Sequence, residues 1–107
     1  MEKRYCTEKL SKDLLDLGYP QHIPNISLYD AQMWLMTQGI HIAPRIYLYH
    51  DSNLDDEVSW EVTIYFEFAA IYTIGQSLSY NDALELGIKD IVNKLKESKQ
   101  NNNIITF

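Results

Sequence analysis

The spacing of apolar residues changes at Gly39, from nearly continuous to alternating. Between Ser27 and Gly39, apolar side chains fill most positions, and only Asp30 and Thr37 share a solvent-facing sector of a helical wheel. A helix of this kind is normally buried against several elements. From Gly39 to Tyr49, apolar residues recur with a period of two, as in a strand with one buried face. The sequence therefore predicts a central helix, buried on most sides, that leads directly into a strand.

Capping residues and glycines mark the predicted helix boundaries. Ser27 and Ser79 each precede an aspartate by three residues, which is the spacing of a capping box in its aspartate form. Thr7 is a further N-cap candidate in front of an amphipathic stretch that Gly18 and Pro20 bring to an end. Gly39 supplies the left-handed residue that closes the central helix. Three helices are therefore expected.

Two further segments favour strands. Residues 58–68 alternate strongly, and an antiparallel hairpin with the first strand is the simplest pairing. Pro44 lacks an amide donor, so it indicates an edge strand or a bulge. Residues 71–74 favour a third strand that ends at Gly75. Either a turn is hidden near residues 68–70, or one long bent strand runs through them.

The predicted fold class is α+β in the order α-α-β-β-(β)-α, with a two- to three-stranded antiparallel sheet and helices on one sheet face. The chain of 107 residues suits a single domain. Its ordered core is expected over about residues 5–97, with the last helix fraying into a polar tail at residues 98–107. Trp34 is expected in the core. The covered sheet face is expected to carry Ile40, Ile42, Ile46, Leu48, Trp60, Val62, Ile64 and Phe66.

Composition and charge narrow the class of protein. Apolar residues make up 46% of the chain, enough to fold, and no apolar run approaches the roughly 18 residues of a membrane span. The first six residues lack an apolar signal region, so a cytoplasmic location is expected. The net charge is −6, and residues 51–86 hold eight acids and no lysine or arginine. Such a segment repels phosphate backbones and can attract a basic protein surface.

Site chemistry typical of enzymes is not evident in the sequence. Cys6 is the only cysteine, which leaves no disulfide and no zinc cluster, and it is interpreted as a terminal or packed free thiol. Asp51, Asn53 and Asp55 have the first spacings of a calcium loop, but Asp56 and Val62 stand where that loop needs glycine and glutamate. Phosphate-binding and dinucleotide motifs are missing as well. We therefore expect no enzyme activity, no cofactor and no metal.

The sheet face opposite the helices is the candidate binding site. Tyrosine brings apolar area with a polar tip and is enriched at protein interfaces, and the chain has 8 tyrosines. A solvated sheet face is the alternative interpretation. His41 and Arg45 are expected to pair across the strands with Glu61 or Glu67. The candidate binding residues are His41, Arg45, Tyr47, Tyr49, Glu61 and Tyr65.

Three stretches carry a resemblance to a known group of proteins. The strings CTEKLSKDLLDLGYP, SLYDAQMWLMTQGIHI and SYNDALELGIKDIVNKL resemble small uncharacterised proteins of Bacteroides-type bacteria and their phages and prophages. The resemblance covers most of residues 5–96, and it implies a mobile-element context but no activity. The order helix, three strands, helix is also similar to the double-stranded-RNA-binding domain. That family needs a basic cluster at the start of its last helix, where residues 80–85 are acidic here.

The sequence therefore favours a non-enzymatic protein-interaction module of phage or mobile-element origin. Its expected partner is a host or phage protein, such as a defence protein that it inhibits or modulates, and a second copy of the chain is a further candidate. The alternative function is a nucleic-acid-associated module that uses the tyrosine-rich sheet face.

Overall fold

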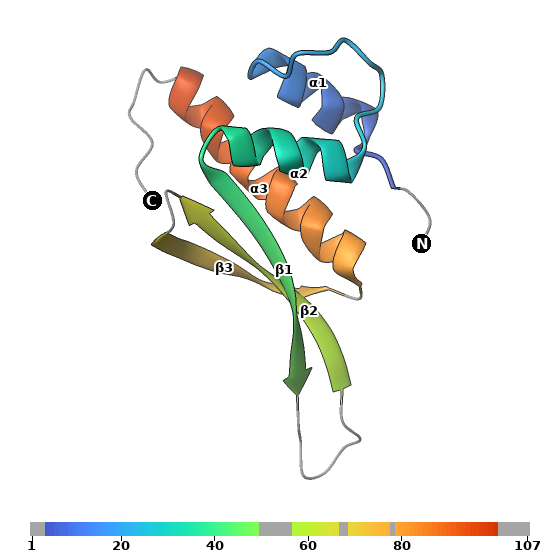
Figure 1. The fold of residues 1–107 in the computed structure, drawn as a ribbon, viewed down its shortest axis with the longest axis vertical. Helices are drawn as coiled ribbons and strands as arrows, with labels where there is room; N and C mark the ends of the chain where they lie inside the picture. Colours follow the sequence, from blue (N-terminus) through green and yellow to red (C-terminus); the bar gives the residue numbers. More distant parts are fainter. Residues whose placement is uncertain (1–3, 50–56, 67–68, 78, 101–107) are drawn as a thin grey trace.

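A computed structural model describes residues 4–49, 57–66, 69–77 and 79–100. The elements form a mixed α+β fold, which confirms the predicted class (Figure 1). Their order along the chain is α1 (Glu8–Asp16), α2 (Leu28–Thr37), β1 (Ile40–Tyr49), β2 (Glu57–Phe66), β3 (Ala69–Ser77) and α3 (Tyr80–Gln100).

The predicted helix caps are confirmed. The backbone N–H of Leu10 donates to Thr7 Oγ1 at 3.1 Å, and the N–H of Asp30 donates to Ser27 Oγ at 3.0 Å. Ser79 Oγ accepts in the same way from the N–H of Asp82, at 3.1 Å. Each hydroxyl satisfies an amide that the first turn of its helix leaves without a partner.

The three strands form one antiparallel sheet in the order β1-β2-β3. Residues 69–77 are therefore a separate third strand, which continues past Gly75. The connection between β2 and β3 falls at residues 67–68, outside the described residues. Pro44 lies on an edge strand, as its lack of a backbone N–H predicts. It pairs with Val62 without any register shift along β1.

Helices α2 and α3 cover one face of the sheet, and α1 packs against α3 (Figure 1). The main core lies under α3, whose Gly87 approaches the sheet closely. A Cβ at this position would lie 2.8 Å from Cγ2 of both Ile42 and Val62. Only glycine allows the helix to come this near, so the layer spacing depends on it.

The prediction that α2 is buried on most sides is wrong. Leu28, Ala31 and Leu35 are buried, but Tyr29 is 64% exposed, and Met33 and Met36 are also exposed. These exposed residues follow the spacing i, i+4, i+7, so they share one face. Trp34 is only half-buried, and its ring meets that of Tyr19 edge-on at 5.8 Å between centroids. The helix therefore contacts the molecule on one side only.

The covered sheet face is also smaller than predicted. Ile40, Ile42, Val62 and Ile64 are buried, and Trp60 and Phe66 are partly buried. Ile46 is 59% exposed because the β1–β2 hairpin extends beyond the helices (Figure 1). The side chain of Leu48 lies outside the described part.

Helix α3 is longer than expected. It runs to Gln100, through the point near Ser98 where fraying was predicted. The remainder of the predicted tail, residues 101–107, lies outside the described residues.

Candidate functional site

The open sheet face, defined here as the side of the sheet away from the helices, carries the candidate binding residues on β1 and β2. Arg45 pairs with Glu61 across the two strands, and His41 pairs with Tyr65. Tyr47 and Tyr49 occupy alternate positions of β1 beyond Arg45, and their side chains lie outside the described part. The structure thus brings four of the six residues into two neighbouring cross-strand pairs.

Arg45 and Glu61 form an ion pair on this face. Arg45 Nε donates to Glu61 Oε1 at 2.6 Å, which confirms the predicted cross-strand pairing. The Arg45 side chain is 62% exposed, whereas that of Glu61 is 19% exposed. An exposed ion pair adds little stability. It does orient the guanidinium, so that the donors other than Nε are available to a ligand.

The centre of the open sheet face is closely packed. Thr63, in the central strand, alternates with the helix-covered Val62 and Ile64, and it is 5% exposed. Its Oγ1 lies 3.0 Å from Oγ1 of Thr73 on β3. His41 and Tyr65 are half-buried beside it. The part of the face around Thr63 is therefore buried, whereas Arg45 is accessible.

One contact at the edge of β1 was not predicted. Gln32 of α2 donates from Nε2 to the backbone carbonyl of Ile42, at 2.8 Å. Ile42 lies two residues before Pro44. In the first half of this edge, the Ile42 carbonyl is therefore bonded to the Gln32 side chain, and Pro44 has no N–H to donate. A glutamine in an apolar helix gave a weak signal of this role, because a polar residue there needs a partner.

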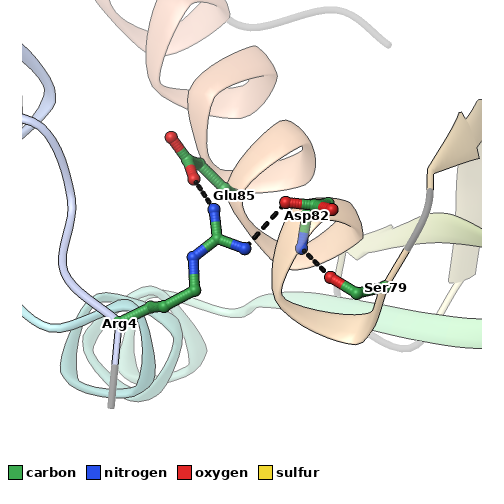
Figure 2. Close-up of polar contacts among 4 residues, drawn as sticks. All are labelled: Arg4, Ser79, Asp82 and Glu85. Atoms are coloured by element: carbon green, nitrogen blue, oxygen red, sulfur yellow. Dashed lines mark hydrogen bonds and ion pairs between the residues drawn. The ribbon is translucent and has the colours of Figure 1, made fainter. Parts of the chain in front are cut away.

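Arg4 neutralises part of the acidic segment, which sequence reasoning also missed. Figure 2 shows its guanidinium between two carboxylates of α3, with Nη1 2.7 Å from Asp82 Oδ1 and Nη2 2.8 Å from Glu85 Oε2. The Arg4 hydrogen bond, followed by the one with Ser79, lowers the pKa of Asp82. The Asp82 hydrogen bond in turn raises the pKa of Arg4. The ion pairs join positions about 80 residues apart in sequence, so no local pattern announces them.

Cys6 is a packed thiol, as interpreted from the sequence. It is 1% exposed, and burial together with the nearby Glu85 raises its pKa to about 12. A thiol with this pKa is almost wholly protonated at neutral pH and is a poor nucleophile.

A small hollow lies between α1 and α3. Its volume is about 110 Å³, well below the roughly 300–1,000 Å³ of typical ligand pockets. Beside it, Lys96 Nζ donates to Asp13 Oδ1 at 2.7 Å. The hollow is lined by Thr7, Lys9, Leu10, Asp13, Glu85, Lys89 and Asn93.

Metal and membrane features were searched within the described ranges. There, His, Cys, Asp and Glu do not gather into any group of three that could hold a metal ion. The calcium-like spacing at residues 51–55 lies outside those ranges. Of the helices in the described ranges, none combines the length and the apolar character that a membrane span requires.

Comparison of the chain with protein-family models, curated proteins and solved structures gives no match in any of the three. The function of the chain must therefore be argued from its own residues.

Proposed function

We propose that this chain is a non-enzymatic protein-interaction module that docks a partner protein on its open sheet face. The observation that carries the proposal is the exposed Arg45, oriented by Glu61 beside the half-buried pair of His41 and Tyr65. Aromatic area beside an oriented guanidinium is the composition of interface hot spots. Helices α2 and α3 lie on the other side of the sheet, and the Arg45 side chain on this face is 62% exposed.

Charge favours a protein over a nucleic acid as the partner. Residues 51–86 contain eight acids and no lysine or arginine. Among the described residues of the open sheet face Arg45 is a single cation, and Arg4 pairs with Asp82 and Glu85 on α3. A phosphate backbone needs several uncommitted cations along its path. A nucleic-acid-associated module remains the alternative because the sequence of β1 is rich in tyrosine, and aromatic side chains can stack on bases.

We also propose a phage or mobile-element origin, with inhibition or modulation of a host or defence protein as the result of docking. This part rests on the sequence resemblance alone. The genes on either side of the coding sequence test it: phage structural or defence-related neighbours support it, whereas a conserved metabolic operon contradicts it.

A quantitative capture experiment tests the docking face. Tagged wild type and the double variant Arg45→Ser/Tyr65→Ser are used to capture proteins from a lysate of the cells that encode the chain. Tyr29→Ser, on the exposed face of α2, is the matched control because it removes an exposed tyrosine elsewhere. A captured partner is then purified and its binding to each form is measured by calorimetry.

The double variant should weaken binding by more than about 2 kcal/mol, or roughly thirtyfold in Kd, while Tyr29→Ser leaves it nearly unchanged. Circular dichroism checks that the variants stay folded, and Arg45→Ser alone serves as the milder change. If a partner binds the double variant as tightly as wild type, the open sheet face is only a solvated surface. If Tyr29→Ser abolishes binding instead, the docking face lies on α2.

A further inference from the structure

The direction of the backbone groups of β1 follows from Pro44. Proline has no N–H, so Pro44 cannot donate to β2, and its pair with Val62 is a non-hydrogen-bonded pair. In an antiparallel ladder the two kinds of pair alternate. The register of β1 has no shift from Ile40 to Tyr49, so its even-numbered residues all point their N–H and C=O groups away from β2. The bond from Gln32 to the Ile42 carbonyl agrees with this direction.

The outer edge of β1 therefore has two halves that divide at Pro44. We call the half beyond Pro44, with Ile46 and Leu48, the open half. Gln32 occupies the Ile42 carbonyl, and Pro44 offers no donor. Beyond Pro44, Ile46 and Leu48 direct their backbone groups outward, and none of the described strands lies beside them. Ile46 is also 59% exposed. A row of unpaired groups on an edge strand is a template for another strand.

The other edge of the sheet is less suited to pairing. Strand β3 breaks register with β2 twice, between Trp60 and Val62 and between Ile64 and Tyr65. Such irregularities twist an edge and interrupt its row of donors and acceptors. The open half of β1 is the more regular edge.

We propose that a second copy of this chain pairs antiparallel with the open half of β1, about a two-fold axis at Tyr47. Ile46 of each copy then lies opposite Leu48 of the other, and each of these two pairs exchanges both backbone hydrogen bonds. The two sheets become one continuous six-stranded sheet, and Pro44 marks where the pairing ends. The inference uses the edge of β1 rather than its face, so it goes beyond the proposed docking function.

Complementarity across the junction favours a second copy as the occupant. The two-fold register uses the outward groups of both Ile46 and Leu48 and needs no donor from Pro44. It places Arg45 opposite position 49 of the other copy, so the two Arg45 residues lie about four positions apart along the junction and like charges do not face each other. Glu57 pairs with Tyr49 within each hairpin, so the antiparallel sense keeps the two Glu57 positions at opposite ends of the junction.

Cysteine cross-linking tests the register. Residues that face each other in a non-hydrogen-bonded pair have Cα atoms about 4.5 Å apart, within the range of a disulfide. Tyr47→Cys should therefore form an intermolecular disulfide under mild oxidation. Arg45→Cys is the matched control on the same strand, since the two Arg45 positions are separated by about four residues, or roughly 13 Å, along the junction. The native thiol of Cys6 is buried and does not interfere.

Sedimentation velocity over a concentration series tests the edge itself. Ile46→Pro removes an outward donor and leaves the β1–β2 bonds intact, as Pro44 already does. Ile46→Thr keeps the donor and a strand-favouring side chain. Ile46→Pro should weaken dimerisation at least about tenfold, because two hydrogen bonds are lost across the two-fold axis, whereas Ile46→Thr should change it only about threefold or less.

Several results would overturn the proposal: a wild type that stays monomeric up to about 1 mM, an Arg45→Cys variant that cross-links as fast as Tyr47→Cys, or an Ile46→Thr variant that loses as much association as Ile46→Pro. A monomeric wild type that still captures a partner through the open sheet face would overturn the second copy alone and leave the proposed docking function standing. Thermal unfolding by circular dichroism confirms that each variant folds.

Discussion

Replacing Gly87 by alanine sets two physical effects against each other. Gly87 lies within α3, where alanine is favoured over glycine by roughly 0.5–1 kcal/mol. The added Cβ would lie 2.8 Å from Cγ2 of Ile42 and of Val62, and 3.3 Å from Cδ1 of Ile64. Carbon atoms prefer about 3.5–4.0 Å, so the two shorter contacts are too close by about 0.7 Å or more.

The crowded atoms have little freedom to move aside. Cγ2 of Ile42 and of Val62 is bonded directly to Cβ, and these β-branched side chains are stiff at χ1. Both residues are buried in the core. The helix must therefore shift away from the sheet, and overpacking of this kind costs about 1–3 kcal/mol. After the gain in helix propensity, Gly87→Ala should destabilise the fold by about 1–2 kcal/mol and lower Tm by about 4–10 °C.

Urea and thermal unfolding followed by far-ultraviolet circular dichroism measure this change. Lys89→Ala, at an exposed position of the same helix, is the control and should be nearly neutral. Combining Gly87→Ala with Val62→Ala should cost less than the sum of the two single changes, by at least about 0.5 kcal/mol, because the second change makes room for the first. A Gly87→Ala variant that is more stable than wild type, as helix propensity alone predicts, would refute the close approach of α3 to the sheet.

Four further outcomes are expected. Trp34→Ala should cost about 2–3 kcal/mol in urea unfolding, below the range for a fully buried aromatic, since Trp34 is half-buried; an unchanged midpoint would contradict its packing on Tyr19. Cys6 should resist a thiol reagent near about pH 8 until denaturant is added, and rapid labelling of the native protein would contradict its raised pKa. Arg4→Met should destabilise the fold at neutral pH, and this effect should be lost as the pH falls below about 3.9. The fold lowers the pKa of Asp82, so the contribution of this carboxylate to stability is present above the ordinary carboxyl pKa and is lost as the pH falls through the lowered value. Urea titrations at several pH values measure the effect, with Arg4→Lys as the charge-retaining control. Fluorescence anisotropy should detect no binding to DNA or RNA at physiological salt, and salt-sensitive micromolar binding would favour the nucleic-acid alternative.

Local chemistry made the element order predictable. A serine or threonine that caps a helix accepts a hydrogen bond from an amide three residues on, and a left-handed glycine ends a helix at its own position. Ser27, Ser79 and Gly39 therefore indicate where helices begin or end without any tertiary context. The cross-strand pair of Arg45 and Glu61 was also accessible, since one hairpin relates two alternating runs. The fold class and part of the candidate site could be predicted from these local features.

The extent of each contact surface was not predictable, because it depends on how far one layer overlaps another. Alternation shows that Ile42 and Ile46 share a strand face, but it does not show where the helix layer stops, and only Ile42 is covered. The same holds for α2. Because apolar residues lie on every side of this helix, its sequence does not show which side packs against the core. Contacts such as Arg4 with Asp82, or Gln32 with Ile42, join segments that only the tertiary fold brings together.

Helix α3 contacts every other helix and strand, and it is the last of the described elements along the chain. During synthesis on the ribosome, the apolar face of the β1–β2 hairpin is therefore complete before α3, one of its two covering helices, exists. At about 5–20 residues per second, translation from Phe66 to Gln100 takes about 2–7 s. Throughout this interval Ile42, Val62 and Ile64 lack the cover that α3 supplies, and only α2 is available to pack on the hairpin. A product truncated before α3 is expected to aggregate, because the apolar face of the hairpin then keeps only part of its cover.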